Sequence, residues 1–164
     1  MSEGIRIRLE GKEKTLATLR GILARTKNPK GLLDNIGASL VASTEHRFET
    51  GTGVDGSPWP ESIRAQLTGG KTLVDTGRLR GSITHNATAR MVEVGTNVIY
   101  AAIHQFGGDI VPKTAKALRF KVGGKWAMTK KVTIPARPFL GIDEDDEKEI
   151  ILIGEDWLRE AANG

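Results

Sequence analysis

The sequence predicts an α+β fold, in which an antiparallel or mixed sheet is packed by two long helices and carries an extended β-hairpin arm and a C-terminal helix. Three observations lead to this prediction. Apolar and charged residues alternate near the N-terminus, which is typical of a strand with one buried face. Two successive segments then repeat apolar residues every three or four positions, as amphipathic helices do. Further on, two alternating segments flank a pair of glycines, which indicates a hairpin.

The length and composition are those of one domain that spans residues 1–164. Hydrophobic residues make up 38% and charged residues 27%, which argues against wholesale disorder. Cysteine is absent, and this excludes disulfides, thiolate metal sites and cysteine nucleophiles. No apolar run approaches the roughly 20 residues of a membrane span, and the N-terminus does not resemble a signal peptide. We therefore expect a soluble intracellular protein.

The formal net charge of +4 is unevenly distributed. Between Ile110 and Ile142 there are eight Lys or Arg and no Asp or Glu, whereas residues 143–147 are all acidic. Adjacent blocks of opposite charge indicate either an assembly surface or an internal clamp.

The first element is a predicted strand. Ile5, Ile7 and Leu9 alternate with charged residues, and Gly11 ends the pattern. Three leucines at spacings of three and four then predict an amphipathic helix over residues 12–25.

A second helix is predicted from Pro29 to about Phe48. Asn28 can accept hydrogen bonds from free amides at the helix start, and proline suits the first helical position because it has no amide to satisfy. The apolar face of this helix consists of Leu33, Ile36, Leu40, Thr44 and Phe48. We expect both helices to pack on the sheet.

Residues 51–73 are predicted to form a mobile loop, because Gly, Thr, Ser, Pro and Asp dominate the composition there. Trp59 lies within this loop, either as an anchor that pins it to the core or as an exposed partner contact. Residues 51–56 match the G-x-G-x-x-G pattern, but they follow a helix and not a strand. We therefore treat the match as a coincidence.

Residues 75–83 predict a helical turn with a polar cap at its start, in which Leu79 and Ile83 point the same way. An antiparallel pair of strands is expected next, over residues 84–87 and 91–94.

Two further stretches are expected to form a structural hub. The first runs from 92 to 108 as a strand, a turn and a short helix closed by a glycine pair, with the apolar side of the helix packed on the core. The second is the proline-rich segment 134–142. The residues assigned to the hub are Tyr100, Ile103, His104, Phe106, Gly107, Gly108, Pro135, Arg137, Pro138 and Phe139.

A basic β-hairpin arm is predicted over residues 110–134. A turn of two glycines would place Trp126 opposite Lys121 and divide the apolar side chains between both faces. A three-residue loop at 123–125 places Trp126 opposite Val122 and keeps the apolar side chains on one face. We therefore predict the three-residue loop.

The C-terminal helix is predicted over residues 144–162. The acidic run suits a helix start, where carboxylates oppose the positive end of the helix dipole. Ile150, Ile153 and Trp157 then repeat at helical spacing.

Catalytic and metal-binding motifs are weak. The histidines at 46, 85 and 104 are far apart in sequence and lie outside the HExxH and GxSxG motifs. His104 could serve as a general base, but a histidine on a short helix more often makes a structural hydrogen bond. We expect no enzyme activity, no cofactor and no metal site.

Residues 94–108, Val-Gly-Thr-Asn-Val-Ile-Tyr-Ala-Ala-Ile-His-Gln-Phe-Gly-Gly, and residues 134–141, Ile-Pro-Ala-Arg-Pro-Phe-Leu-Gly, together resemble the phage virion morphogenesis family, also called tail completion proteins. Motifs at 47–49, 55–59 and 73–83 match the family pattern in the same order, so that the resemblance covers roughly residues 30 to 142. The chain departs from the pattern chiefly in an expanded Thr-Gly-Gly-Lys segment at 68–71.

The resemblance implies a non-enzymatic structural protein of a tailed phage or prophage that acts in tail completion and head-tail joining. Its expected partners are phage tail and neck or connector proteins and further copies of itself, in a ring if the rotation closes. The expected location is the host cytoplasm during assembly and then the tail or neck of the virion, with no membrane contact.

In that setting the loop, the arm and the acidic helix start are the expected contact regions, and the acidic start can meet the arm of an adjacent copy. The candidate contact residues are Trp59, Lys113, Lys116, Arg119, Lys121, Lys131, Asp143, Glu144 and Asp145. The alternative function is a nucleic-acid-binding module that uses the arm, although the arm lacks a series of aromatic residues for stacking on bases. The charged face of the arm can also be interpreted as a solvated strand surface that only prevents aggregation through the sheet edge.

Overall fold

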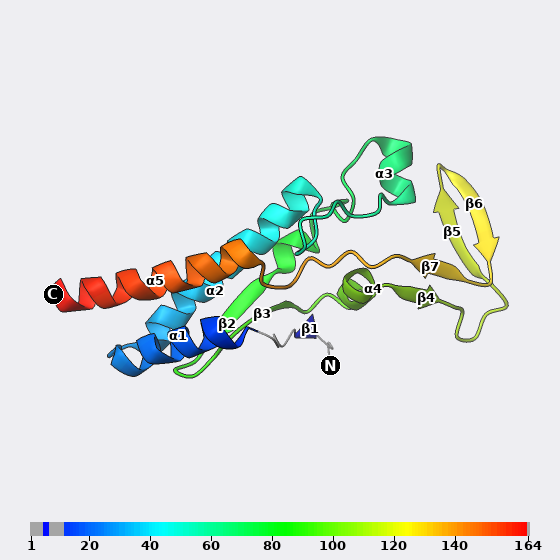
Figure 1. Ribbon diagram of the computed structural model, residues 1–164. Coiled ribbons are helices and arrows are strands. Elements are labelled where there is room, and N and C mark those ends of the chain that lie inside the picture. The colour runs from blue at the N-terminus through cyan, green and yellow to red at the C-terminus, as the bar shows by residue number, and fades with distance from the viewer. Residues whose placement is uncertain (1–4, 7–11, 164) are drawn as a thin grey trace.

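The chain forms an elongated molecule with helices at one end and a two-stranded arm at the other (Figure 1). The computed structural model describes residues 5–6 and 12–163. At the helical end lie α1 (Glu13–Arg25), α2 (Pro29–Thr50) and α5 (Glu144–Asn163), and α5 packs against both of the others. All three helices were predicted within two residues of these bounds.

A three-stranded antiparallel sheet lies against α2, in the order β1-β3-β2. The expectation that both helices pack on the sheet holds for α2, whereas α1 packs chiefly on α5. Its strands are β1 (Ile5–Arg6), β2 (Thr84–Ala87) and β3 (Val92–Thr96). The predicted pairing of β2 with β3 is confirmed, and Thr84 lies opposite Gly95. The sheet and the helices confirm the α+β class. Of the strand expected near the N-terminus, Ile5 and Arg6 are described, whereas Ile7 and Leu9 lie outside the described residues.

The start of α2 follows the predicted capping pattern. The side chain of Asn28 accepts a hydrogen bond from the Gly31 amide at 3.0 Å, and Pro29 is the first helical residue. Further along, Gly37 lets the helix lie close to the sheet, because a Cβ there would come 2.5 Å from a ring carbon of His85 and 2.8 Å from a methyl of Val92.

The core consists of two clusters, and α2 contributes to both. The first lies between the helices and the sheet and contains Ile22, Leu32, Leu33, Ile36, Ala87 and Ile150. The second lies at the C-terminal end of α2 and contains Phe48, Trp59, Leu79, Ile83, Val98, Ala101, Phe139 and Leu140. The second cluster therefore joins residues from most of the motifs that resemble the phage family.

The segment 51–73 contains a short helix that the sequence did not predict, α3 (Ile63–Thr68). The Ser62 side chain caps it by accepting from the Ala65 amide at 3.1 Å, and Gly69 ends it in the left-handed conformation. Six residues are too few for a helical apolar repeat to show in the sequence. The mobility of this segment stays a prediction.

The expected helical turn after this segment is present as the 3₁₀ turn η1 (Arg80–Ser82). The predicted polar cap is wrong, because the turn starts after Leu79 and no side chain of the described residues caps it. Leu79 and Ile83 flank it and are 3% and 6% exposed, as the shared orientation predicted.

The short helix α4 (Ala101–Phe106) buries a different face from the one predicted. Tyr100 and Phe106 were expected in the core but are 43% and 64% exposed, and Ile103 is half-buried. Ala101 and Gln105 are buried instead. The expectation failed because it assumed that the large apolar side chains point inward, whereas the core needs the amide of Gln105, as described below.

The arm is built from two pairs of antiparallel strands in succession. At its base, β4 (Gly108–Ile110) pairs with β7 (Val132–Ile134), and beyond them β5 (Leu118–Val122) pairs with β6 (Lys125–Thr129). The turn of the outer pair returns toward α3 (Figure 1), where a Cβ on Gly123 would lie 3.6 Å from a methyl of Leu67.

The predicted three-residue loop of the outer hairpin is wrong. Gly123 and Gly124 form a two-residue turn, with φ values of 56° and 80°, and Trp126 pairs with Lys121. Both glycines have positive φ, as the tightest hairpin turns require. The prediction assumed one buried face, but Trp126 is 59% exposed, so burial does not select the register here.

The C-terminal helix α5 has Ile150 buried, and Ile153 and Trp157 lie half-buried beside it. No helix within residues 12–163 is both long enough and apolar enough to span a bilayer.

Candidate assembly interface

The extended segment 135–141 connects the arm to α5 (Figure 1). Most of the buried hydrogen bonds of side chains in the described residues are made to its backbone. Gln105 on α4 holds its backbone. The side-chain oxygen of Gln105 accepts from the amides of Phe139 and Leu140, both at 3.0 Å, and its nitrogen donates to the Leu140 carbonyl at 2.9 Å. A buried backbone segment outside any sheet is thus satisfied by one amide side chain, which explains why Gln105 faces inward.

The loop 51–73 is attached to the same segment through Trp59. The indole nitrogen donates to the Pro138 carbonyl at 3.2 Å, and the ring packs edge-on against Phe48 with centroids 5.5 Å apart. The ring of Phe48 also packs against the ring of Phe139, with centroids 5.2 Å apart. Trp59 is only 7% exposed, so it anchors the loop and offers little surface to a partner.

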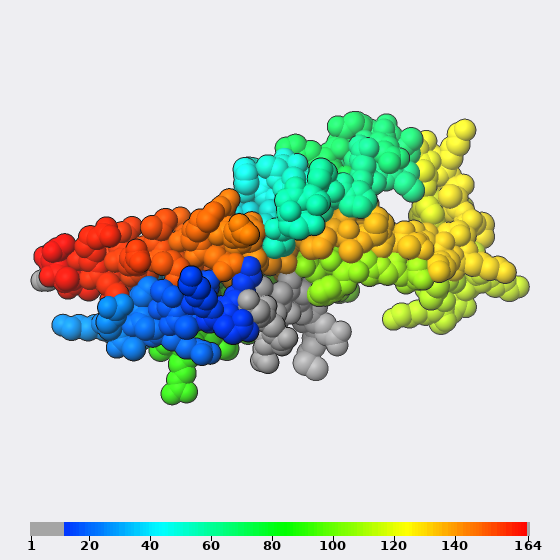
Figure 2. All heavy atoms as spheres, in the orientation of Figure 1, coloured from blue at the N-terminus to red at the C-terminus, as the bar shows by residue number. Residues whose placement is uncertain are grey.

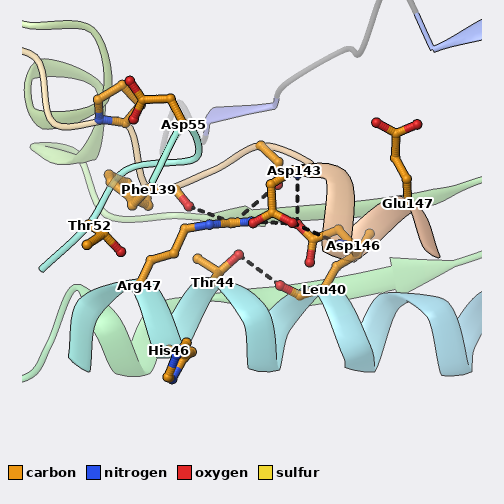
Figure 3. Close-up of polar contacts among 12 residues, drawn as sticks. Leu40, Thr44, His46, Arg47, Thr52, Asp55, Phe139, Asp143, Asp146 and Glu147 are labelled. Atoms are coloured by element: carbon orange, nitrogen blue, oxygen red, sulfur yellow. Dashed lines mark hydrogen bonds and ion pairs between the residues drawn. The ribbon is translucent and has the colours of Figure 1, made fainter. Parts of the chain in front are cut away.

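Arg47 on α2 holds the start of α5 (Figure 3). Its Nη1 donates to the carbonyls of Phe139 and Gly141, both at 3.3 Å. Its Nη2 lies 2.7 Å from a carboxylate oxygen of Asp143 and 2.5 Å from one of Asp146. One buried guanidinium therefore fixes both the extended segment and the helix that follows it.

The two aspartates also cap α5 reciprocally. The Asp146 amide donates to the Asp143 side chain at 2.8 Å, and the Asp143 amide donates to the Asp146 side chain at 3.1 Å. This is the capping-box arrangement, with Asp in place of the more usual Glu. Partial burial opposes ionisation of Asp143, but hydrogen bonds from Arg47 and from backbone amides outweigh it and lower the pKa of Asp143 below its ordinary value.

Part of the acidic run is consequently an internal clamp. Asp143, expected as a partner contact, is bound to Arg47 within the same chain. Glu147 pairs with Lys12 and accepts from Thr15 at 2.6 Å. Glu144 and Asp145 are exposed, although Asp145 also pairs with Lys148 at 2.9 Å.

The arm keeps its charged residues on the surface. Lys113, Lys116, Arg119, Lys121 and Lys131 are all exposed, and Lys131 pairs with Asp109 at 2.7 Å. The two-residue turn places cations and the exposed indole on one face, where the Arg119 guanidinium lies 4.3 Å and the Lys121 ammonium 5.2 Å from the centroid of the Trp126 ring.

Gly107 lies where the base of the arm meets the segment 135–141. A Cβ at this residue would come 2.7 Å from the Ala136 amide nitrogen and 3.0 Å from the Ile134 carbonyl, and its φ is 69°. Beside it, the Arg137 amide donates to the His104 carbonyl at 2.7 Å. Pro135 and Pro138 are exposed.

His104 does not make the structural hydrogen bond expected of its ring. Its Nδ1 is buried and has no hydrogen-bond partner within the described part of the chain. The same residues contain no group of three or more His, Asp or Glu arranged to hold a metal ion.

Sequence reasoning assigned no role to Arg47, Gln105 or Asp146. Arg47 follows Thr44 and precedes Phe48 on the apolar face of α2, and a lone arginine within such a face is the signal that could have identified it. Its partners Asp143 and Asp146 lie about a hundred positions away in sequence, so pattern alone could not identify them.

The chain is similar to known phage proteins over most of its length. The model of the phage virion morphogenesis family matches residues 11–159. The chain is 31% identical to "Mu-like prophage FluMu G protein 2" of Haemophilus influenzae, over 94% of this chain and 96% of that protein. It is 33% identical to "Putative capsid assembly protein G" of Escherichia phage Mu, over 69% of each. None of the solved structures matches it significantly. The chain therefore belongs to the phage virion morphogenesis family.

Proposed function

We propose that the protein is a non-enzymatic structural component of a tailed phage or prophage that acts in tail completion and head-tail joining. It contacts tail and neck or connector proteins, first in the host cytoplasm and then in the tail or neck of the virion. Membership of a virion morphogenesis family supports an assembly role. The observation that best supports contact-based action is the basic arm projecting from one end of an elongated body (Figure 2).

The arm and α5 carry opposite charge. Residues 110–134 contain seven Lys or Arg and no Asp or Glu, whereas α5 contains eight acidic and two basic residues. Because the arm and α5 lie at opposite ends (Figure 1), they can meet only between separate copies. This supports a head-to-tail contact in which the arm of one copy lies on α5 of the next, and such a contact closes into a ring if the rotation permits.

Asp143 and Asp146 already pair with Arg47, so the arm of the adjacent copy would contact the exposed acidic residues of α5. These are Glu144, Asp145, Glu149, Glu155, Asp156 and Glu160.

Light scattering on the purified protein tests the self-contact. We expect association at about 50 mM salt that is lost at about 1 M, because salt screens exposed charges. Reversing Lys113 and Lys116 to Glu should abolish it. The matched control reverses Lys27 and Lys30, which are also exposed and three residues apart but lie at the helical end, and it should not weaken association. A monomer at both salt concentrations would remove the basis for the head-to-tail contact.

Electron microscopy of particles made without this protein tests the wider function. We expect separate heads and tails to accumulate, because the joining step lacks a component. Complete virions in normal yield would contradict the proposal.

One observation favours a second function, nucleic-acid binding by the arm. Trp126 is 59% exposed and lies beside Arg119 and Lys121, so that a base could stack on the indole while cations bind phosphate. A salt-titrated DNA-binding assay decides this point. A steep loss of binding with salt would support the second function, and no binding at low salt would eliminate it.

Catalysis by His104 is tested by His104→Gln. We expect the variant to fold and to support virion assembly, and a folded variant that fails to do so would reopen the question.

A further inference from the structure

A cationic pocket lies between the loop 62–79, α4 and Arg137. Its volume is about 450 Å³, and Tyr100, His104 and Leu79 form part of its wall. It is separate from the arm and from the Arg47 cluster, and we call it the Arg137 pocket.

Arg137 is a buried cation that pairs with no carboxylate of the described residues. The residue is 4% exposed, its Nε donates to the Pro60 carbonyl at 2.6 Å, and its amide donates to the His104 carbonyl. Within residues 12–163 no carboxylate forms an ion pair with it, and burial lowers the pKa of its guanidinium. Among the described residues the side chain donates only through Nε, and a buried charge is costly unless it is paired, so the guanidinium of this lining residue has unused capacity to donate.

His104 also lines the pocket and carries a second polar atom without a partner among the described residues. Its Nδ1 is buried without a hydrogen-bond partner among the described residues. Burial, and secondly the charge of Arg137, lower the pKa of His104, which favours the neutral ring.

The rim of the pocket is also basic. Arg64 and Arg78 line it, and Asp75 is the one acidic residue in the described lining. Nη1 of Arg64 lies 3.8 Å from a carboxylate oxygen of Asp75, and its Nη2 donates to the carbonyls of Lys71 and Val74. Part of its hydrogen-bonding capacity is therefore already used within the chain. Arg78 is exposed.

We propose that the Arg137 pocket binds a carboxylate group of a partner protein, either an acidic side chain or a chain terminus. The planar guanidinium donates two parallel hydrogen bonds to a carboxylate, and Arg78 adds charge at the entrance. The ring of Tyr100 and the side chain of Leu79 offer apolar contact to the carbon atoms that carry the carboxylate. Asp75 repels any anion at the rim, and it repels a doubly charged phosphate more than a singly charged carboxylate.

Arg137 belongs to the segment that joins the arm to α5, so a carboxylate bound to it would fix a partner near the base of the arm. That placement rests on the proposed assembly function, whereas carboxylate binding itself does not.

The experiment measures binding of small probes to the whole protein by NMR of the arginine Nε–H groups. N-acetyl-glutamate α-amide offers a side-chain carboxylate, N-acetyl-alanine offers a terminal one, and inorganic phosphate represents the competing anion. We expect saturable binding of at least one carboxylate probe with a shift of the Arg137 signal. The probe that binds more tightly identifies the source of the carboxylate.

Two variants and a control make the test specific. Arg78→Gln removes a rim charge without removing a described hydrogen bond of its side chain, and we expect roughly fivefold to tenfold weaker binding. Arg137→Lys should abolish binding, and circular dichroism establishes whether it folds. Arg90→Gln changes the net charge equally at an exposed site outside the pocket and should leave binding unchanged.

Three results would overturn the proposal. The first is that neither carboxylate probe binds the folded wild-type protein saturably at probe concentrations up to about 50 mM. The second is that Arg78→Gln and Arg90→Gln weaken binding equally, and the third is that phosphate binds more tightly than both carboxylate probes. Each can occur whether or not the protein joins heads to tails, so the failure of this inference is distinguishable from the failure of the proposed function.

Discussion

The Nη2 atom of Arg47 on α2 lies 2.5 Å from a carboxylate oxygen of Asp146 on α5, and the two side chains are 4% and 7% exposed. Through this pair the middle of the chain holds the start of the C-terminal helix. Because Arg47 also donates to the carbonyls of Phe139 and Gly141, the same contact fixes the end of the segment that leads from the arm.

We predict that Arg47→Met lowers the free energy of unfolding by about 3–5 kcal/mol, because it leaves Asp146 as a buried charge without its partner. Urea unfolding measures this. Arg20→Ala, at an exposed position on α1, is the control and should change stability by less than about 0.5 kcal/mol. Combining Arg47→Met with Asp146→Asn should cost less than the sum of the two single changes, since the unpaired charge is then absent. A loss below about 1 kcal/mol for Arg47→Met would contradict the clamp.

Asp143 should make stability depend on pH. Its pKa is lower in the folded protein than the ordinary value of 3.8, so the folded state binds fewer protons than the unfolded state and acid favours unfolding. Its stabilising contribution is therefore fully present above the ordinary value and is lost as pH falls through the lower, folded value.

The measurement compares wild type with Asp143→Asn by urea unfolding across this range. Asparagine can still cap the helix but carries no charge. The advantage of the wild type should be constant near neutral pH and should shrink below about pH 4. An advantage that grew on acidification would show that the sign is wrong.

Gly107 should not tolerate a side chain. Gly107→Ala forces a left-handed φ on an L-residue and places a Cβ 2.7 Å from the Ala136 amide, so we expect a loss of at least about 2 kcal/mol. Gly21→Ala is the matched substitution on α1, where a Cβ meets nothing within 4 Å, and it should stabilise by about 0.5–1 kcal/mol. Thermal unfolding of both variants compares them, and equal effects would show that the close approach at Gly107 has no energetic consequence.

The sequence predicted those helices and strands in which buried apolar residues recur at regular intervals along the chain. The long helices were found because apolar residues such as Leu33 and Ile36 recur on one face, and β2 and β3 because their segments alternate around a polar turn. The hairpin register was missed for the opposite reason. Neither face of the outer arm is deeply buried, so the glycine turn determines the pairing of Trp126 with Lys121.

The contacts around the segment 135–141 could not be predicted in the same way. Gln105 is polar, and nothing in the short helix α4 shows that two backbone amides and a carbonyl some 35 residues later require it. Arg47 meets Asp146 across 99 positions of sequence. The residues of the family motifs could be identified from sequence, but their roles depend on long-range contacts that only the folded chain shows.

The most direct test of the central claim removes the outer arm and leaves its base. Ile110 pairs with Val132 across β4 and β7, so replacing residues 111–131 with Asn-Gly closes the remaining strands with a two-residue turn. The shortened protein is then supplied to a phage that lacks the full-length form, beside the Lys27→Glu, Lys30→Glu protein as a folded control. We predict that the control restores complete virions, whereas the shortened protein folds but leaves heads and tails unjoined in electron micrographs. Normal virions from the shortened protein would contradict the account.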